Sequence, residues 1–373
     1  MSFQDVIKYY IDNYCKSSCC CKKKIKKILN YRNGSSLFIC NFYCCDRKRE
    51  NRYYCNKDVS IVEATKYLKT ETIPISLETQ LFKPFMKSLR LLGNTFAEEI
   101  HKRSIVEFDG NSTGKYDCRC ELADIAILLY SVKQKLIKLT LNQVKLGRSD
   151  YRYSDGTICF KIENRYQWLL LSKRFLFRPY KNYKTFSGNV LKKALLPSIG
   201  SFGIFHKEEL SNEYEFNYFV ADTLVPSSNK LRCKLEFKEE FGIIRSFENN
   251  DCLSEINACP SLSCFYCALK KGLIGSPVNH LLNDLSFYNS LIELIKEGRE
   301  ITNKLDNDSD NRKDTNNRIL NEVYKLIEDL RVEPNGNNYD NHELFNKHLK
   351  FSIRNLVIVK LDDLKVVKNV YEE

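Results

Sequence analysis

Cys15-Lys-Ser-Ser-Cys19-Cys20-Cys21 and, after eighteen intervening residues, Cys40-Asn-Phe-Tyr-Cys44-Cys45 form the stretch that decides how the N-terminal part of this chain folds. Each group can supply two thiolates from one tight turn, which is the donor arrangement of a tetrahedral zinc site. Between the groups, Asn33-Gly34 is typical of a hairpin turn and residues 36–39 are typical of a strand. The spacing predicts one zinc ion bound by Cys15, Cys19, Cys40 and Cys44.

The choice of ligands within each group stays open. Cys20 and Cys45 compete with their neighbours, because the spacing is three or four residues rather than the more diagnostic two. Cys21 and Cys55 are weaker candidates. The alternative interpretation is a set of incidental cysteines in a segment rich in Lys and Tyr. Zinc is favoured, because so small a unit has few other core residues and a metal would explain its folding.

The same segment carries most of the positive charge. The formal net charge is +12, and residues 1–57 hold 13 Lys and Arg against 4 Asp and Glu, a net +9. Four thiolates on one Zn²⁺ add about −2, which leaves the segment clearly positive. Interleaved aromatic residues are able to stack on bases. We therefore predict nucleic-acid contact, with an anionic membrane or protein surface, or a merely solvated basic face, as alternatives. The predicted contact residues are Lys22, Lys23, Lys24, Lys26, Lys27, Arg47, Lys48, Arg49 and Arg52.

A second cysteine group lies in the C-terminal half. Cys264-Phe-Tyr-Cys267 has the spacing of a zinc knuckle, and Cys252 and Cys259 complete a predicted four-thiolate site. His280 is an alternative fourth ligand. Buried cysteines acting as small apolar residues are the main competing interpretation, and a Cys-x-x-Cys redox site is a weaker one.

The hydrophobic pattern predicts an α+β fold with a central antiparallel sheet. Apolar residues at helical spacing predict helices over 81–92 and 121–139, with 95–103 continuing the first one after a break. Short β-rich runs separated by turn residues predict strands. These runs are residues 157–162, 169–177, 199–205, 214–221 and 231–237.

Near the C-terminus, Ser276-Pro277 is typical of a helix start, and apolar residues over 281–295 predict the helix that follows. A further helix is predicted over 318–331, and strands over 356–361 and 364–370. The expected domains are a basic zinc module (1–57), a mixed α+β domain containing the second cysteine group (58–301), a flexible linker (302–317) and a C-terminal helix and strand segment (318–373).

Signatures of catalysis are missing from the pattern. Glycine-rich phosphate loops are absent, and the 5 histidines are scattered outside known motifs, so we predict a non-enzymatic protein. No secretory signal and no apolar stretch long enough to span a membrane is visible. We therefore expect a reducing compartment, in which the cysteines are thiols or metal ligands.

One more basic and aromatic run lies in the middle of the chain, from Lys173 to Lys184, and it contains Arg178 and Tyr180. Such a run is able to follow a phosphate backbone. The equally weighted alternative is an edge strand whose charges discourage aggregation.

The first cysteine group, the text Leu37-Phe38-Ile39-Cys40 and the second group together resemble the baculoviral major early zinc-finger protein family. The resemblance implies zinc as cofactor and a host nuclear and cytoplasmic protein that associates with the virion nucleocapsid. It implies roles in viral DNA replication, gene expression and virion production, as a regulatory or assembly factor. The 47-kDa, non-catalytic subunit of the late RNA polymerase of these viruses is the second candidate. A capsid- or membrane-associated adaptor is the third. The pattern predicts no oligomeric state.

Overall fold

The computed structural model describes eleven ranges of the chain. They are residues 25–30, 36–41, 63–67, 81–99, 105–147, 157–181, 186–207, 214–247, 253–304, 310–331 and 353–361. Both helices and strands occur in these ranges, largely in separate runs such as the strands between residues 95 and 162 and the helices between residues 285 and 330, which confirms the predicted α+β class.

The centre of the molecule is an eight-stranded sheet, in the order β16-β11-β10-β7-β6-β18-β3, with β17 also paired to β7. Its strands are β3 (Thr95–Glu99), β6 (Ile125–Ser131), β7 (Leu136–Leu146), β10 (Gly200–Lys207), β11 (Tyr214–Val220), β16 (Ala258–Cys259), β17 (Ser276–Pro277) and β18 (Asn355–Lys360). β10 runs parallel to β7, and β18 runs parallel to β6. The predicted antiparallel sheet is therefore wrong in this respect, and the sheet is mixed.

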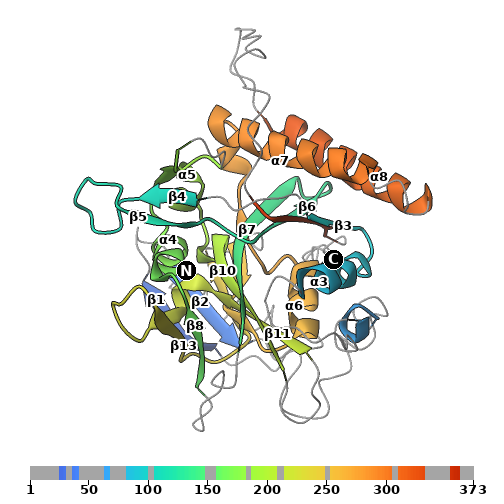
Figure 1. Cartoon of the computed structure of the whole chain (residues 1–373). Coiled ribbons are helices and arrows are strands. Elements are labelled where there is room, and N and C mark those ends of the chain that lie inside the picture. The colour runs from blue at the N-terminus through green and yellow to red at the C-terminus, as the bar shows by residue number, and fades with distance from the viewer. Residues whose placement is uncertain are drawn as a thin grey trace, which may run out of the picture.

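Helices cover both faces of this sheet (Figure 1). One face packs against α3 (Phe82–Arg90) and α6 (Leu262–Lys270). The other packs against α4 (Arg165–Lys173), α7 (Leu285–Lys304) and α8 (Asp310–Leu330), of which α7 and α8 lie side by side. The central strands are consequently buried on both sides.

Burial on both faces explains why the helix predicted over 121–139 is wrong. Every residue of β6 is buried; Ile127 and Leu129 belong to the core on one face, and Leu128 and Tyr130 to the core on the other. A strand buried on both faces is apolar throughout, so its sequence also satisfies helical spacing. The segment is in fact β6, a short turn and the start of β7.

Three smaller sheets surround the central one. Their strands are β8 (Ile158–Ile162), β12 (Leu224–Pro226) and β13 (Cys233–Phe237); β4 (Ile105–Phe108), β5 (Cys118–Glu121) and β9 (Phe177–Pro179); and β1 (Ile25–Asn30), β2 (Ser36–Asn41), β14 (Ile243–Phe247) and β15 (Ser254–Ile256). Short helical turns connect these strands: α5 (Asn189–Lys192), η4 (Pro197–Ile199), η5 (Ala221–Thr223) and η7 (Asn279–Leu281).

The strand predicted before the second cysteine pair is confirmed as β2, which pairs antiparallel with β1. The Asn33-Gly34 turn itself lies outside the described residues. β2 also pairs with β14, so Cys40 lies opposite Ile244. The N-terminal hairpin therefore shares a sheet with a segment about two hundred residues further along the chain.

Two local predictions are wrong for identifiable reasons. Residues 169–177, predicted as a strand, lie mostly in α4, whose start is capped by the Asn164 side chain accepting a hydrogen bond from the Tyr166 N–H (3.0 Å). Residues 95–103 do not continue α3. The left-handed backbone at Gly93 and Asn94 turns the chain, and β3 then pairs with β18.

Two C-terminal boundaries also differ from expectation. Ser276 does not cap a helix; it lies in β17, and its hydroxyl accepts a hydrogen bond from the Leu196 N–H (3.0 Å). α7 begins later, where the Asp284 carboxylate accepts from the Ser286 N–H (3.1 Å). Residues 310–317, predicted as linker, form the first turns of α8. The strand predicted at 356–361 is confirmed as β18, whereas residues 364–370 lie outside the described ranges.

Candidate nucleic-acid interface

Most of the predicted N-terminal site lies outside the described residues. This is true of Cys15, Cys19 and Cys44, and of all the predicted basic contact residues except Lys26 and Lys27. Those two lysines lie in β1, and Cys40 lies in β2. Zinc binding by the first cysteine group therefore stays a prediction.

The second cysteine group is only partly described, because Cys252 lies outside the described residues. Cys259 lies in β16, whereas Cys264 and Cys267 lie one turn apart in α6, and all three are buried in the core. The knuckle predicted for Cys264 and Cys267 is thus a helix, capped by Ser261. Within the described ranges, no three His, Cys, Asp or Glu side chains are grouped so as to hold a metal ion. Zinc at this group also stays a prediction.

The basic and aromatic run at 173–184 has a clear structural position. Its centre forms β9, which is an edge strand of the sheet β5-β4-β9. The predicted edge position is therefore confirmed for Phe177–Pro179, and the side chain of Arg178 is 59% exposed. Residues 182–185 lie outside the described ranges.

Glu107, on the central strand β4, organises the outer face of this sheet. Arg119 on β5 and Arg178 on β9 both lie directly opposite Glu107 in the strand register. The Arg178 Nε donates to Glu107 Oε1 at 2.9 Å, and the Arg119 Nε lies 3.5 Å from Glu107 Oε2. One carboxylate is thus shared by two guanidinium groups, which leaves a surplus positive charge.

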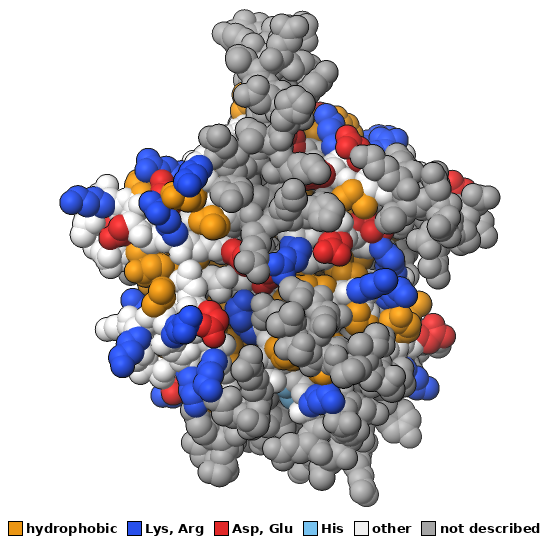
Figure 2. All heavy atoms as spheres, viewed as in Figure 1, with side chains coloured by type: hydrophobic (Ala, Val, Ile, Leu, Met, Phe, Trp, Pro, Cys, Tyr) orange, Lys and Arg blue, Asp and Glu red, His pale blue; other side chains and the backbone are white. Residues whose placement is uncertain are grey.

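Two tyrosines extend this row at its ends. The Arg119 guanidinium lies over the Tyr180 ring at 4.2 Å from its centroid, and Arg178 lies over Tyr116 at the same distance. We call these five residues, Tyr116, Arg178, Glu107, Arg119 and Tyr180, the Glu107 ladder. Figure 2 shows Lys and Arg side chains gathered at the upper left, where Figure 1 places β4 and β5.

Burial distinguishes the members of the ladder. The Glu107 side chain is only 11% exposed, whereas that of Arg119 is 53% exposed. The opposite face of β4 and β5 enters the core through Val106, Phe108 and Cys120. The alternation of the pleat therefore turns the arginines to solvent and holds the carboxylate between them.

The loop between β4 and β5 places Tyr116 at one end of the ladder. The Asp109 carboxylate accepts hydrogen bonds from the backbone N–H groups of Thr113 (2.9 Å) and Gly114 (2.6 Å). Gly114 has a positive φ of 78°, which a residue with a side chain rarely adopts. This closed loop returns the chain to β5 with Lys115 exposed beside Tyr116.

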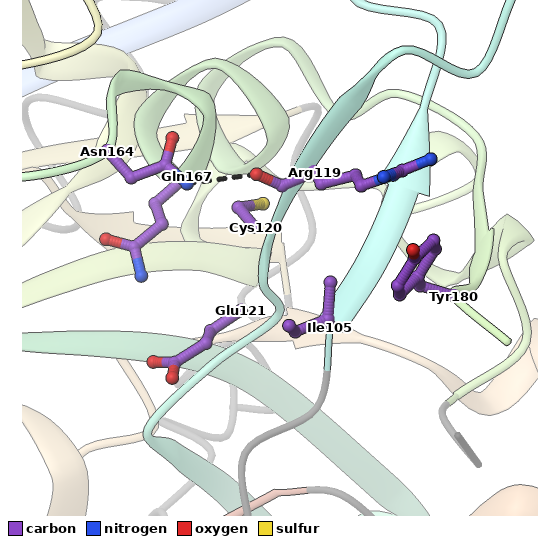
Figure 3. Close-up of a pocket in the computed structure, with 7 residues that line it drawn as sticks. All are labelled: Ile105, Arg119, Cys120, Glu121, Asn164, Gln167 and Tyr180. Carbon is purple, nitrogen blue, oxygen red and sulfur yellow. Dashed lines mark hydrogen bonds between the residues drawn. The ribbon is translucent and has the colours of Figure 1, made fainter. Parts of the chain in front are cut away.

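A cavity of about 470 Å³ adjoins the ladder, and Arg119 and Tyr180 belong to both (Figure 3). Among the described residues it is lined by Ile105, Arg119, Cys120, Glu121, Asn164, Gln167 and Tyr180. The Asn164 amide donates to the Arg119 carbonyl oxygen at 2.9 Å, which joins the start of α4 to β5. Burial raises the pKa of the Cys120 thiol well above its ordinary value, so this wall of the cavity is uncharged.

Sequence reasoning found Arg178 and Tyr180 through their basic and aromatic run, but it missed Glu107, Arg119 and Tyr116. The only local signal for Arg119 is its position between Cys118 and Cys120, two residues that the pleat turns to the opposite face. The partnership with Glu107 has no local signal, because it depends on which strands pair.

No protein-family model matches the chain, and neither a curated protein nor a solved structure is significantly similar to it. None of the helices in the described ranges is long and apolar enough to cross a membrane. Fold and site together define an α+β protein with a mixed central sheet and an exposed arginine and tyrosine ladder on a peripheral sheet.

Proposed function

We propose that this protein is a non-enzymatic regulatory or assembly factor that contacts nucleic acid, and that the Glu107 ladder is one of its contact surfaces. The observation that carries the proposal is the ratio of charges in the ladder. Two arginines that are more than half exposed share one carboxylate that is mostly buried. The surplus charge faces solvent, where a phosphate is able to reach it.

The chemistry of the ladder suits a phosphate backbone. Each guanidinium has five N–H donors, and one contact to Glu107 leaves most of them available to phosphate oxygens. Stacking on Tyr180 and Tyr116 holds the guanidinium planes in place, which reduces the side-chain entropy that binding would cost. Tyrosine rings beside a phosphate site are also positioned to contact bases.

A second contact surface in this proposal is the N-terminal basic segment, folded around zinc. It supplies a net +9 of the chain's formal +12. β2 pairs with β14, so this segment is attached to the body of the protein rather than carried only by a linker. In the setting of the baculoviral resemblance, the two surfaces would serve viral DNA replication, gene expression and nucleocapsid assembly in the host nucleus and cytoplasm.

The test of the ladder is nucleic-acid binding by the full chain, measured by fluorescence anisotropy over a range of salt concentrations. The wild type should bind with an affinity that falls steeply with salt. Arg119→Glu and Arg178→Glu, each made singly, should weaken binding and flatten the salt dependence. Arg299→Glu, an exposed charge reversal on α7, is the matched control and should have a smaller effect. Equal effects of the ladder and control variants would show that the ladder is not a contact surface.

The test of the zinc segment is the metal content of the purified chain. The wild type should contain zinc, and Cys40→Ser should lose the ion bound by the first cysteine group. Absence of zinc from the wild type would contradict this part of the proposal without affecting the ladder.

A further inference from the structure

The cavity beside the ladder contains one polar side chain whose hydrogen-bonding groups are unused. Gln167, on α4, is only 7% exposed. Its backbone N–H bonds to Asn164, but its side-chain amide has no hydrogen-bond partner among the described residues. Figure 3 shows this side chain extending from α4 on the same side as that of Glu121. The amide nitrogen and oxygen are not themselves fully buried, so they reach the open cavity, where a ligand or an ordered water can hydrogen-bond to them.

The amide of Gln167 suits the edge of a nucleobase. A carboxamide has a donor and an acceptor side by side, which is the pattern that pairs with base edges. The cavity volume of about 470 Å³ is within the range of small-ligand pockets. Ile105 and the neutral Cys120 thiol provide an apolar wall against which a flat ring can pack.

Arg119 connects the cavity to the Glu107 ladder. It lines the cavity, it lies over Tyr180, and its guanidinium also faces Glu107. A nucleotide with its phosphate at Arg119 would therefore have its base directed either along the ladder or into the cavity. The unpartnered amide of Gln167 favours the cavity.

We propose that the cavity binds one unpaired base of a single-stranded nucleic acid, with the base edge on Gln167 and the adjoining phosphate on Arg119. This inference rests on the proposed function and makes it more specific. A base in a duplex has its pairing edge occupied and is stacked on both sides, so it can enter only after it is unpaired and unstacked, which costs free energy. The protein should thus prefer single strands to duplexes of equal length.

Glu121 adds a preference among bases. A carboxylate only accepts hydrogen bonds, and its two oxygens together have about four acceptor sites. It lines the cavity together with Gln167. Bases with an exocyclic amino group, such as adenine and cytosine, can donate to it, whereas thymine and uracil offer no amino group. The expected order is therefore adenine- or cytosine-rich single strands above thymine-rich ones.

The experiment compares the binding of oligo-dC, oligo-dT and a duplex of the same length to the full chain. The wild type should bind oligo-dC most tightly. Gln167→Leu should weaken binding of oligo-dC by about two- to tenfold, the range for losing one or two hydrogen bonds. Its salt dependence should not change, because no phosphate contact is lost. Gln134→Leu, which removes an amide in the turn between β6 and β7, is the matched control.

A measurement on the wild type keeps the inference testable if Gln167→Leu does not fold. Oligonucleotides containing 5-iododeoxycytidine should crosslink, on irradiation, to peptides that include residues 105–121 or 164–180. Crosslinks confined to other segments would overturn the inference.

The outcomes separate this inference from the proposed function. One outcome is that single strands and duplexes bind equally, Gln167→Leu binds like the wild type, and the two arginine reversals weaken the binding of both ligands. In that case the cavity binds no base, whereas the ladder still binds phosphate. If the wild type binds no nucleic acid at all, the proposed function and the inference both fail.

Discussion

Two ionic clusters in this protein have opposite ratios of charge. In the Glu107 ladder, two arginines share one carboxylate, and both arginines are more than half exposed. In the second cluster, which we call the Arg245 cluster, one arginine meets the three carboxylates of Asp222, Glu239 and Glu255. Here the arginine side chain is 9% exposed and that of Glu255 is fully buried.

The geometry of the Arg245 cluster is closed. Both carboxylate oxygens of Asp222 accept from the Arg245 Nη1 at 3.0 Å, and the Arg245 Nη2 lies 3.3 Å from Glu239. The second oxygen of Glu255 accepts from the Ser198 N–H at 2.7 Å. The cluster thereby connects β14, β15, η4 and η5, and its charges are directed at one another.

The two clusters differ in charge ratio and in burial, and this difference indicates which of them is available to a partner. Buried charges interact strongly and depend on each other, whereas exposed arginines contribute little to folding and keep donors for a ligand. The Arg245 cluster should therefore affect stability, and the Glu107 ladder should affect binding. Each of the following predictions separates these two properties.

The largest effect is expected from Arg245→Met. This change leaves three carboxylates without their common partner, and that of Glu255 is fully buried, so it should lower the free energy of unfolding by about 3–5 kcal/mol. Urea denaturation followed by circular dichroism measures this effect. Arg299→Met, an exposed arginine on α7, should change stability by less than about 0.5 kcal/mol. Similar midpoints for the two variants would contradict a structural role for the cluster.

The next effect is on binding. Arg178→Ala removes one guanidinium of the ladder and should weaken single-strand binding by about 1.5–3 kcal/mol, the contribution of a charge-assisted hydrogen bond. The slope of affinity against salt should fall by roughly 0.7 for each lost phosphate contact. Stability should change little, because this side chain is mostly exposed. Anisotropy titrations measure the affinity, and urea denaturation of the same preparation measures the stability. A large loss of stability with unchanged affinity would show that Arg178 serves folding rather than binding.

A smaller effect of opposite sign is expected from Glu107→Gln. Removing the shared carboxylate frees both arginines for phosphate and should strengthen binding by less than about 1 kcal/mol. The amide is nearly the same size as the carboxylate, so the packing of β4 between β5 and β9 should be preserved. Weaker binding by this variant would show that Glu107 is needed to hold the arginines in position.

The smallest effect is a pH dependence specific to the Arg245 cluster. Burial raises the pKa of Glu255 more than the nearby Arg245 lowers it. The folded state therefore binds this proton more tightly than the unfolded state, and the contribution to stability declines as pH rises from about 4.5 through the raised pKa. Unfolding free energies measured across this range should show that decline in the wild type and not in Glu255→Gln. Identical pH profiles of the wild type and Glu255→Gln would show that Glu255 does not cause the decline in stability.

Much of the secondary structure was predictable where the signal is local. α3 and the later turns of α8 show one apolar face, and β8, β10, β11, β13 and β18 coincide with short β-rich runs. Prediction failed for β6, which is buried on both faces and so lacks alternation. It failed for α4 because apolar residues outweighed the capping signal of Asn164.

The candidate interface was predictable only in part. The run containing Arg178 and Tyr180 is visible in the sequence as a basic and aromatic segment. Its partners on β4 and β5 come from about sixty to seventy residues earlier in the chain, and they lie opposite it because of strand pairing and register. Gln167 is an ordinary helical residue until the cavity beside it is known.

The sequence by itself determined the composition-dependent properties: a formal charge of +12, its concentration in the first 57 residues, and the cysteine spacing that predicts zinc. These depend on residues close together in the chain. Only the tertiary structure decided that Arg119 and Arg178 share Glu107 on an exposed face, while Arg245 is enclosed by three carboxylates. The physical reason is that hydrogen bonding between strands distant in sequence sets the neighbours of each charge, and burial then sets whether that charge stabilises the fold or remains available to a ligand.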